Sequence, residues 1–242
     1  MCYNSEQKQT VQQMERSFRR SVREPEKYQE QYHSNGFSHK DFAVIANING
    51  DDAIHLLSWG IIPFFIKTLS DAKKLRNSTL NAKSETIFDL PSFKTSITTK
   101  RCVIPLTAFF ESRDIDGVKY PYYIYPRNSD YFMVGGIYSS WKDKVSGEIL
   151  NTFSIITTPS NQMMSQIHNL KQRMPLILKE RDIESWIDPT LPKQSIIELM
   201  QPYADDQMAA YTVSKDVNSS KVNSDMADIS TRIDYEGVNC FC

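Results

Sequence analysis

The sequence predicts an α+β domain with a curved antiparallel sheet or barrel-like core and surrounding short helices. Strand-like apolar segments separated by turn residues dominate the centre of the chain, and the helical patterns are short and lie towards its ends. With 242 residues and 40% hydrophobic content, the chain suits one globular body better than two. Strands in hairpins with interspersed helices are typical of this class. We predict one domain over residues 1–222 and a loosely held tail over residues 223–242.

The first third of the chain combines one helical pattern with one strand. Val11, Met14 and Phe18 recur at spacings of three and four within the polar segment 5–20, which predicts an amphipathic helix soon after Cys2. Residues 53–59 form a predicted strand, and Pro63 marks an irregular exit from it. Short helices are expected in the basic stretch that follows.

The central and C-terminal parts contain most of the predicted sheet. The strand at residues 101–111 is expected to pair with residues 120–125 across a turn at Asp116 and Gly117. Further strands are predicted at 131–141, 152–158 and 174–178, a short helix at 160–167, and two helices at 180–186 and 193–200.

Composition excludes several classes of protein. No apolar run approaches the roughly 18 to 20 residues of a membrane helix, and the polar start does not resemble a signal peptide, so we expect a cytoplasmic protein without membrane association. The four cysteines and four histidines lack the spacing of a disulfide framework or a zinc site. We therefore expect reduced thiols, no metal and no cofactor, and we expect a monomer.

One local charge excess stands out against a formal net charge of −1. Residues 67–101 contain eight basic and three acidic side chains, enough to hold several phosphates of a nucleic acid. We predict that the phosphate contacts include Lys67, Lys73, Lys74, Arg76, Lys83 and Arg101. Trp59, just before Gly60 and Pro63, suits either stacking on an unpaired base or a place in the core.

Cys2 is the first candidate for covalent chemistry. Its small side chain permits removal of Met1, which would leave an α-amine and a thiol on one residue. An α-amine titrates near about 7.7 to 8.0, so part of it is nucleophilic at neutral pH. It can form a Schiff base with an aldehyde, and the adjacent thiol can close that imine into a thiazolidine. The alternative is an incidental cysteine in a frayed terminus.

Three further polar residues have both a catalytic and a structural interpretation. Glu111 ends an aromatic strand, where burial would suit it to proton transfer, or it is a surface charge. His168 is either an acid or base or a hydrogen-bonded loop histidine. Asn81 opens a segment for which helix capping is the simpler explanation.

The order of the motifs resembles the SOS-response-associated peptidase (SRAP) family over residues 1 to about 222. The resemblance is carried by Met1-Cys2, Trp59-Gly60-Ile61-Ile62-Pro63, Asn81-Ala82-Lys83-Ser84-Glu85-Thr86, Arg101-Cys102-Val103-Ile104-Pro105, Phe109-Phe110-Glu111, Thr157-Thr158-Pro159-Ser160-Asn161 and His168 with Arg173-Met174-Pro175. It implies a protein that crosslinks to abasic sites in single-stranded DNA and thereby shields them.

The resemblance also implies a role for each matching residue. Cys2 would be the nucleophile, Asn81 would position its backbone and amine, Glu111 would move protons, and His168 would help to open the deoxyribose ring. Arg173 joins the expected DNA contacts. The implied peptidase activity is removal of Met1, and the Schiff base permits weak lyase activity by β-elimination.

Some positions depart from the family pattern. Tyr3 and Asn4 replace the usual glycine and arginine, which removes an expected phosphate contact. Lys83 replaces an arginine and loses its bidentate geometry, and Ser112 replaces a common tryptophan.

Two other functions remain open from the sequence. A cysteine hydrolase or peptidase acting on external substrates would need only the Cys2 thiol, with His168 as its base. A non-catalytic module that binds single-stranded nucleic acid would need only the basic segment and exposed aromatic residues.

Overall fold

The computed structural model describes residues 2–241 and contains a closed five-stranded barrel. Neighbouring strands of the ring are antiparallel except for the parallel pair β4 and β10. In order around the ring, the strands are β3 (Asp41–Ile48), β4 (Asp51–Trp59), β10 (Ile149–Pro159), β9 (Phe132–Lys142) and β6 (Arg101–Leu106). Three short strands extend it: β5 (Asn81–Lys83) and β11 (Arg173–Pro175) beside β10, and β12 (Ile177–Leu178) beside β9.

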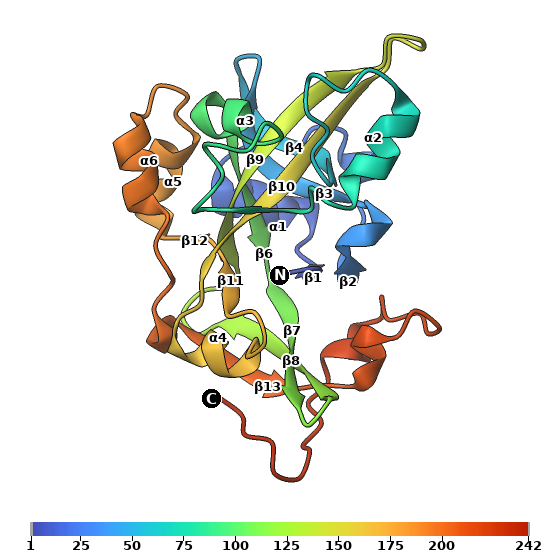
Figure 1. Ribbon diagram of the computed structural model, residues 1–242, viewed down its shortest axis with the longest axis vertical. Helices are drawn as coiled ribbons and strands as arrows, with labels where there is room; N and C mark the ends of the chain where they lie inside the picture. The colour runs from blue at the N-terminus through green and yellow to red at the C-terminus, as the bar shows by residue number, and fades with distance from the viewer. Residues whose placement is uncertain (1, 242) are drawn as a thin grey trace.

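A second, antiparallel sheet lies below the barrel in the view of Figure 1, and β1 lies near the middle of the molecule. Its strands run in the order β13 (Met208–Thr212), β8 (Val118–Pro126), β7 (Ala108–Ile115), β1 (Asn4–Gln7) and β2 (Gln31–Asn35). The expected α+β barrel-like core with short helices is therefore confirmed.

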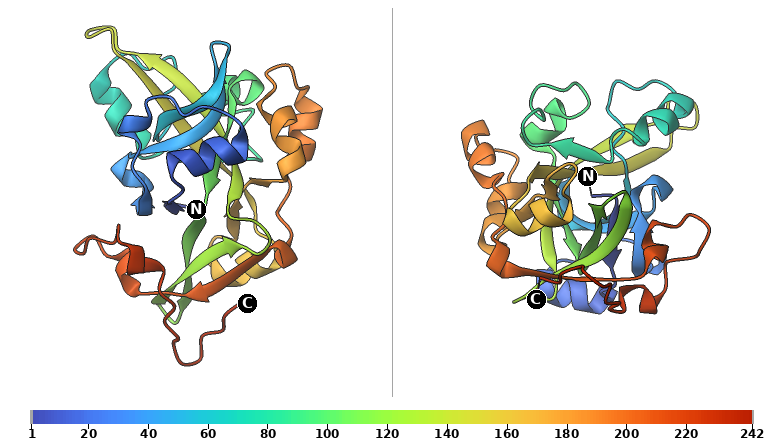
Figure 2. Two further views of the ribbon diagram at one scale, coloured as in Figure 1. Left: turned by 180° about the vertical axis from the view of Figure 1, so that it is seen from behind. Right: turned by 60° about the horizontal axis from the view of Figure 1, so that its bottom comes forward.

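Short helices cover the outside of the barrel, as the views of Figure 2 show for α1 in front of β3 and β4. The α-helices are α1 (Val11–Phe18), α2 (Leu69–Arg76), α3 (Lys94–Thr99), α4 (Gln162–Ile167), α5 (Ile183–Ile187) and α6 (Lys193–Leu199). Single 3₁₀ turns occupy Pro25–Lys27, Gly36–Ser38, Glu180–Asp182, Asp205–Gln207, Lys215–Asn218 and Ala227–Ser230.

The alternation of side chains along the strands separates two cores. One fills the barrel and reaches the second sheet: Phe42, Trp59 and Phe153 pack there with Cys2 and Tyr122. The opposite faces of the same strands form the other core, which the helices cover with side chains such as Met14, Ile97 and Trp186. Cys2 thus belongs to the core at the junction of barrel and sheet.

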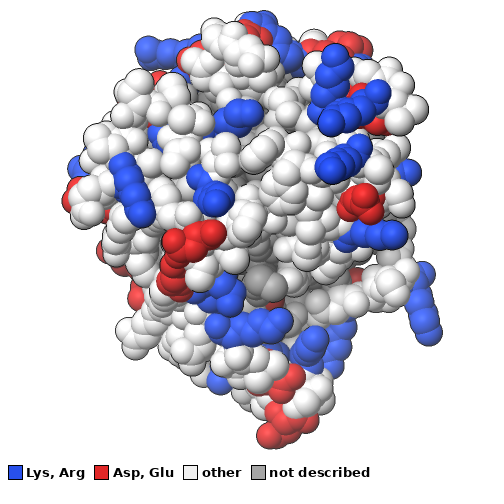
Figure 3. All heavy atoms as spheres, turned by 45° about the horizontal axis from the view of Figure 1, so that its top comes forward, with Lys and Arg blue, Asp and Glu red and all other residues white. Residues whose placement is uncertain are grey.

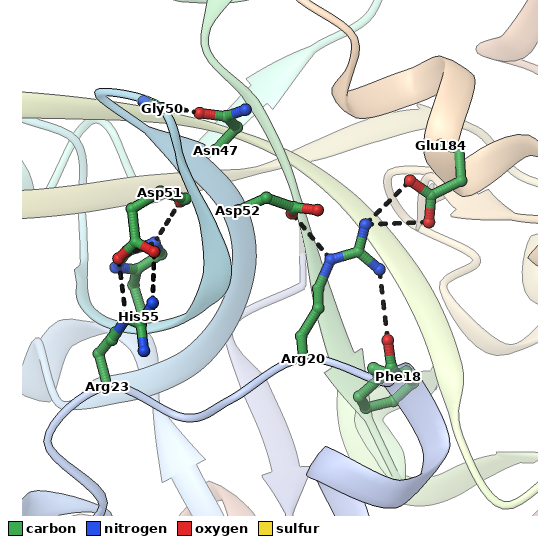
Figure 4. Close-up of polar contacts among 9 residues, drawn as sticks. All are labelled: Phe18, Arg20, Arg23, Asn47, Gly50, Asp51, Asp52, His55 and Glu184. Atoms are coloured by element: carbon green, nitrogen blue, oxygen red, sulfur yellow. Dashed lines mark hydrogen bonds and ion pairs between the residues drawn. The ribbon is translucent and has the colours of Figure 1, made fainter.

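Arg20 connects two helices to a strand of the barrel (Figure 4). Its guanidinium donates to Asp52 on β4 at 2.8 Å and to both carboxylate oxygens of Glu184 on α5 at 2.9 and 3.0 Å. Beside it, Arg23 pairs with Asp51. These contacts fix the end of α1 and helix α5 against the β3–β4 hairpin.

The N-terminal helix is shorter than expected. The helix begins only after Thr10, whose hydroxyl accepts from the Gln13 amide while the Gln13 side chain accepts from the Thr10 amide. Residues 4–7 are instead strand β1, because Ser5, Glu6 and Gln7 are buried between β2 and β7. The expected helix within residues 5–20 is therefore confined to residues 11–18, and strand β1 lies between it and Cys2.

Most central elements agree with the prediction. The hairpin of β7 and β8 turns at Asp116 and Gly117, both with positive φ. The predicted strand 101–111 divides into β6 and β7, which belong to different sheets, and 174–178 divides into β11 and β12. Strands β1, β2, β3, β5 and β13 were not predicted.

The C-terminal tail is packed against the second sheet. The Tyr122 hydroxyl donates to the Asn239 carbonyl at 2.7 Å, and Phe241 forms a bridge with Ala210. Nearer the start of the tail, the Asp225 carboxylate accepts from the backbone amide of Tyr32 at 2.8 Å. The expectation of a loosely held tail is wrong for the described residues. Among residues 2–241, no helix is both long and apolar enough to span a bilayer.

Candidate active site

Strand β1 places Cys2 between the two sheets. Asn4 is opposite Phe110 on β7 on one side and Asn35 on β2 on the other, and the Gly36 amide donates to the Tyr3 carbonyl at 2.7 Å. The Cys2 side chain is only 1% exposed. Met1 lies outside the described residues.

Asn81 reaches Cys2 from the barrel. Because β5 runs parallel to β10 with Asn81 opposite Ile155, the asparagine is held at the barrel wall rather than at a helix start. Its Nδ2 donates to the Cys2 carbonyl at 3.1 Å. Its Oδ1 is buried and has no hydrogen-bond partner within residues 2–241. The capping interpretation is therefore wrong.

Glu111 and His168 lie next to each other although 57 residues separate them in the sequence. Glu111 Oε2 is 3.5 Å from His168 Nδ1. His168 ends α4, and the adjacent Asn169 exchanges two hydrogen bonds with the backbone of Asp114 on β7, at 3.1 and 2.7 Å. The strand that carries Glu111 is thereby joined directly to the loop that carries His168.

The tautomer of His168 follows from its neighbours. Nδ1 lies 2.9 Å from the Arg173 carbonyl oxygen, which can only accept a hydrogen bond. Nδ1 therefore carries the proton in the neutral ring, and Nε2 has the lone pair. The side chain can act as a base only through Nε2.

Burial perturbs all three ionisable groups. It raises the pKa of the Cys2 thiol to about 12, with a further rise from the nearby Glu111 carboxylate. Burial also raises the pKa of Glu111 above its usual range and lowers the pKa of His168 to about 4. At neutral pH the thiol and the imidazole are thus both uncharged. A cluster of perturbed groups of this kind is typical of a functional site.

Arg173 borders this cluster but is already paired. Its guanidinium forms a bidentate ion pair with Glu85 and donates to the Thr157 carbonyl at 2.6 Å. The ion pair lowers the pKa of Glu85 to about 2. A phosphate could bind the Arg173 guanidinium only by displacing the Glu85 carboxylate.

Two of the predicted DNA contacts are structural residues. Trp59 is fully buried in the barrel, where its Nε1 donates to the Leu80 carbonyl at 2.8 Å and its ring stacks on Phe153. Arg101 is 1% exposed, and its guanidinium donates to backbone carbonyls on both α3 and α5. The proposed base stacking by Trp59 and phosphate contact by Arg101 are therefore wrong.

The remaining basic residues divide by exposure. Arg76 donates to the carbonyls of Gly60 and Trp59 at 3.1 and 2.9 Å, so it too has a structural role. The exposed members are Lys67, Lys73, Lys74 and Lys83. On the face drawn in Figure 3, lysine and arginine side chains form separate patches around a central hollow.

Two exposed aromatic residues escaped the sequence analysis. Phe64 and Phe65 are 67% and 44% exposed and lie two to three residues before Lys67. The signal in the sequence was the pair of adjacent phenylalanines after Pro63. Two adjacent side chains do not both point to the core-facing side of a strand or helix, so at least one could have been expected to be exposed. Within residues 2–241, no group of three His, Cys, Asp or Glu side chains is arranged to hold a metal ion.

A buried cysteine beside an amide, a carboxyl and a histidine, at the junction of a barrel and a sheet, matches a known class of protein. The chain belongs to the SOS response associated peptidase (SRAP) family, whose model matches residues 1–220.

Individual relatives agree with this membership. Abasic site processing protein YoqW of Bacillus subtilis is 35% identical over 187 residues, which cover 76% of this chain and 80% of that protein. Chicken abasic site processing protein HMCES is 31% identical over 184 residues, covering 67% of this chain and 53% of that protein. A crystal structure of a protein from Bacteroides thetaiotaomicron superposes with a TM-score of 0.89 at 35% identity, covering 96% of this chain and all of that one.

Proposed function

We propose that this protein processes abasic sites by forming a thiazolidine between Cys2 and the sugar aldehyde in single-stranded DNA. The observation that carries the proposal is the convergence of Asn81, Glu111 and His168 around the second residue of the chain. Two relatives with matching chains are named abasic site processing proteins. The proposed substrate is therefore an aldehyde that DNA damage creates.

Three steps connect the free chain to the adduct. Hydrolysis of the bond between Met1 and Cys2 consumes one water and exposes the α-amine. The amine then attacks the open aldehyde, and loss of one water leaves an imine. Finally the sulfur bonds to the same carbon while the thiol proton passes to nitrogen, which closes the thiazolidine ring.

The positions of the polar groups suit these steps. The buried Oδ1 of Asn81 can accept from the new α-amine while Nδ2 holds the Cys2 carbonyl. Because burial raises the pKa of Glu111, its carboxyl group holds a proton more readily than an exposed glutamate does, which suits it to proton transfer. His168 can act through Nε2 on the sugar hydroxyl as the ring opens, since an abasic sugar is mostly a closed hemiacetal.

The electrostatics favour an amine nucleophile over a thiolate. A cysteine hydrolase needs a thiolate paired with an imidazolium, but burial keeps the Cys2 thiol protonated and His168 neutral. The amine mechanism needs neither charge, because the thiol enters only after the imine exists. This is why we place the hydrolase second.

The DNA path is proposed to cross the exposed lysines. Lys67, Lys73, Lys74 and Lys83 would contact phosphates, and the exposed Phe64 and Phe65 offer surfaces on which bases can stack. The buried Trp59 supports this path only indirectly, by fixing the strand from which residues 60–67 emerge.

The test combines intact mass spectrometry with a denaturing gel. Protein whose mass shows loss of Met1 is incubated with single-stranded DNA containing one abasic site, and the same strand with an intact base is the control. We expect an adduct that lacks one water relative to its two components and survives denaturation. Cys2→Ala should form only an imine, seen as a stable band solely after borohydride reduction.

Two results would reject the proposal. Protein with a free Cys2 amine that yields no adduct would exclude crosslinking. A borohydride-independent adduct of equal yield with Cys2→Ala would show that the sulfur takes no part.

A further inference from the structure

A groove of about 680 Å³ lies away from the candidate active site, between β12 and the chain that follows α6. Figure 1 shows these elements together on the left of the molecule. Phe132, Ile177 and Tyr203 are among the apolar residues that line it. Cys2, Asn81, Glu111 and His168 are not among its lining residues, so the groove needs a separate explanation.

The two walls of the groove are held firmly. Strand β12 pairs with β9, with Ile177 opposite Val134. On the opposite wall, the Tyr203 carbonyl accepts from Asn161 Nδ2 at 2.8 Å, and the Asp205 carboxylate accepts from the Met163 amide at 2.7 Å. Because helix α4 thus fixes this wall, a ligand would enter a preformed groove at little ordering cost.

One wall offers an open strand edge. In the described residues, β12 stands last in the strand order of its sheet, so only one of its edges pairs with another strand. Ile177 and Leu178 are 5% and 4% exposed, and both line the groove. An edge strand that lines a groove can accept an extended segment through backbone hydrogen bonds, while side-chain pockets select alternate residues. The apolar lining next to β12 can receive every second side chain of such a segment.

The rim gives the groove its charge. Four carboxylates line it, Glu180, Asp182, Glu198 and Asp206, against the cation Lys179; Arg181 Nε also lies 3.8 Å from Asp182 Oδ1, so acidic side chains outnumber basic ones by two. This excess repels DNA phosphates and attracts lysine or arginine side chains. We propose that the groove binds an extended segment of a partner protein, with apolar residues that alternate with basic ones. The proposal does not depend on the chemistry at Cys2.

The test uses a fluorescently labelled peptide of alternating leucine and lysine, titrated with the full chain and followed by anisotropy. Two matched peptides separate the contributions: alternating leucine and glutamate tests charge, and methylation of alternate backbone nitrogens tests strand pairing. The triple variant Glu180→Lys, Glu198→Lys, Asp206→Lys changes only exposed side chains of the rim. Glu148→Lys, exposed on the β9–β10 hairpin, is the charge-reversal control.

We expect the leucine and lysine peptide to bind at least about tenfold more tightly than either matched peptide, and the triple variant to weaken it by at least about tenfold. Glu148→Lys should have no effect. Equal binding of the basic and acidic peptides, or unchanged binding to the triple variant, would overturn the proposal. Circular dichroism of each variant separates loss of binding from loss of fold.

Discussion

Replacing Arg101 by lysine separates a structural arginine from a phosphate contact. The side chain keeps its charge, so a residue that serves only to bind phosphate would tolerate the change with moderate loss. In the structure, however, the guanidinium donates to the carbonyls of Ile97, Thr98, Trp186 and Asp188, with distances of 2.8, 2.7 and 2.7 Å for the first three. One ammonium group cannot reach acceptors on both α3 and the end of α5.

The expected cost follows from the lost hydrogen bonds. Each buried acceptor left without a donor costs about 1 to 3 kcal/mol, and these costs are not additive. We therefore expect Arg101→Lys to lower the free energy of unfolding by about 3 to 5 kcal/mol, out of a total of roughly 5 to 15 kcal/mol.

Urea unfolding followed by tryptophan fluorescence measures this change, because the Trp186 ring centroid lies 5.9 Å from the Arg101 guanidinium carbon. The salt dependence of DNA binding is measured on the same protein and should keep its slope. A free energy of unfolding within about 0.5 kcal/mol of the original, together with weaker binding to single-stranded DNA at fixed salt, would refute the structural assignment.

Three further predictions concern the candidate site. Asn81→Asp places an acceptor against the Cys2 carbonyl in place of the 3.1 Å donor, so adduct formation should slow by at least about tenfold in gel time courses. Asn81→Ala should slow it by less, and rates equal to that of the original protein in both variants would remove Asn81 from the site. With the pKa of His168 lowered to about 4, its ring stays neutral above that pH, so the adduct rate should rise with pH as the α-amine loses its proton, at or below about 8, without a contribution from His168. An inflection near about 6 that disappears in His168→Ala would contradict this. Neutralising Lys67, Lys73 and Lys74 together to glutamine should reduce the salt slope of binding to single-stranded DNA by about 2, whereas neutralising Arg16, Arg181 and Lys193 should leave it unchanged.

The sequence predicted local structure well where side-chain period and turn chemistry agreed. The β7–β8 hairpin is an example, because Asp116 and Gly117 both adopt the positive φ that its turn requires. Strand β1 was missed because its buried side chains are Ser5, Glu6 and Gln7, which carry no apolar alternation. Their burial depends on partners about 100 residues away on β7, which no local pattern can reveal.

The candidate site shows the same division. Motif order led us to expect Cys2, Asn81, Glu111 and His168 in one site. The structure places Asn81 on β5 against Cys2, which precedes β1, and Glu111 on β7 against His168 at the end of α4. Charge counting was less successful, because it cannot separate a buried arginine such as Arg101 from an exposed lysine such as Lys73. A guanidinium that caps helix ends and one that binds phosphate look alike in a sequence.

In the proposed mechanism, the burial of Cys2 orders the amine and thiol chemistry in time. A thiol with a pKa of about 12 is a poor nucleophile, so it would not compete with the α-amine for the aldehyde. Once an imine forms on the same residue, the sulfur is held within bonding distance of the electrophilic carbon, and proximity compensates for its weak nucleophilicity. When the sulfur bonds to the imine carbon, the electron pair of the C=N bond moves to nitrogen. The nitrogen can then take the proton that leaves the sulfur. The same burial that disfavours a cysteine hydrolase therefore favours slow, intramolecular ring closure.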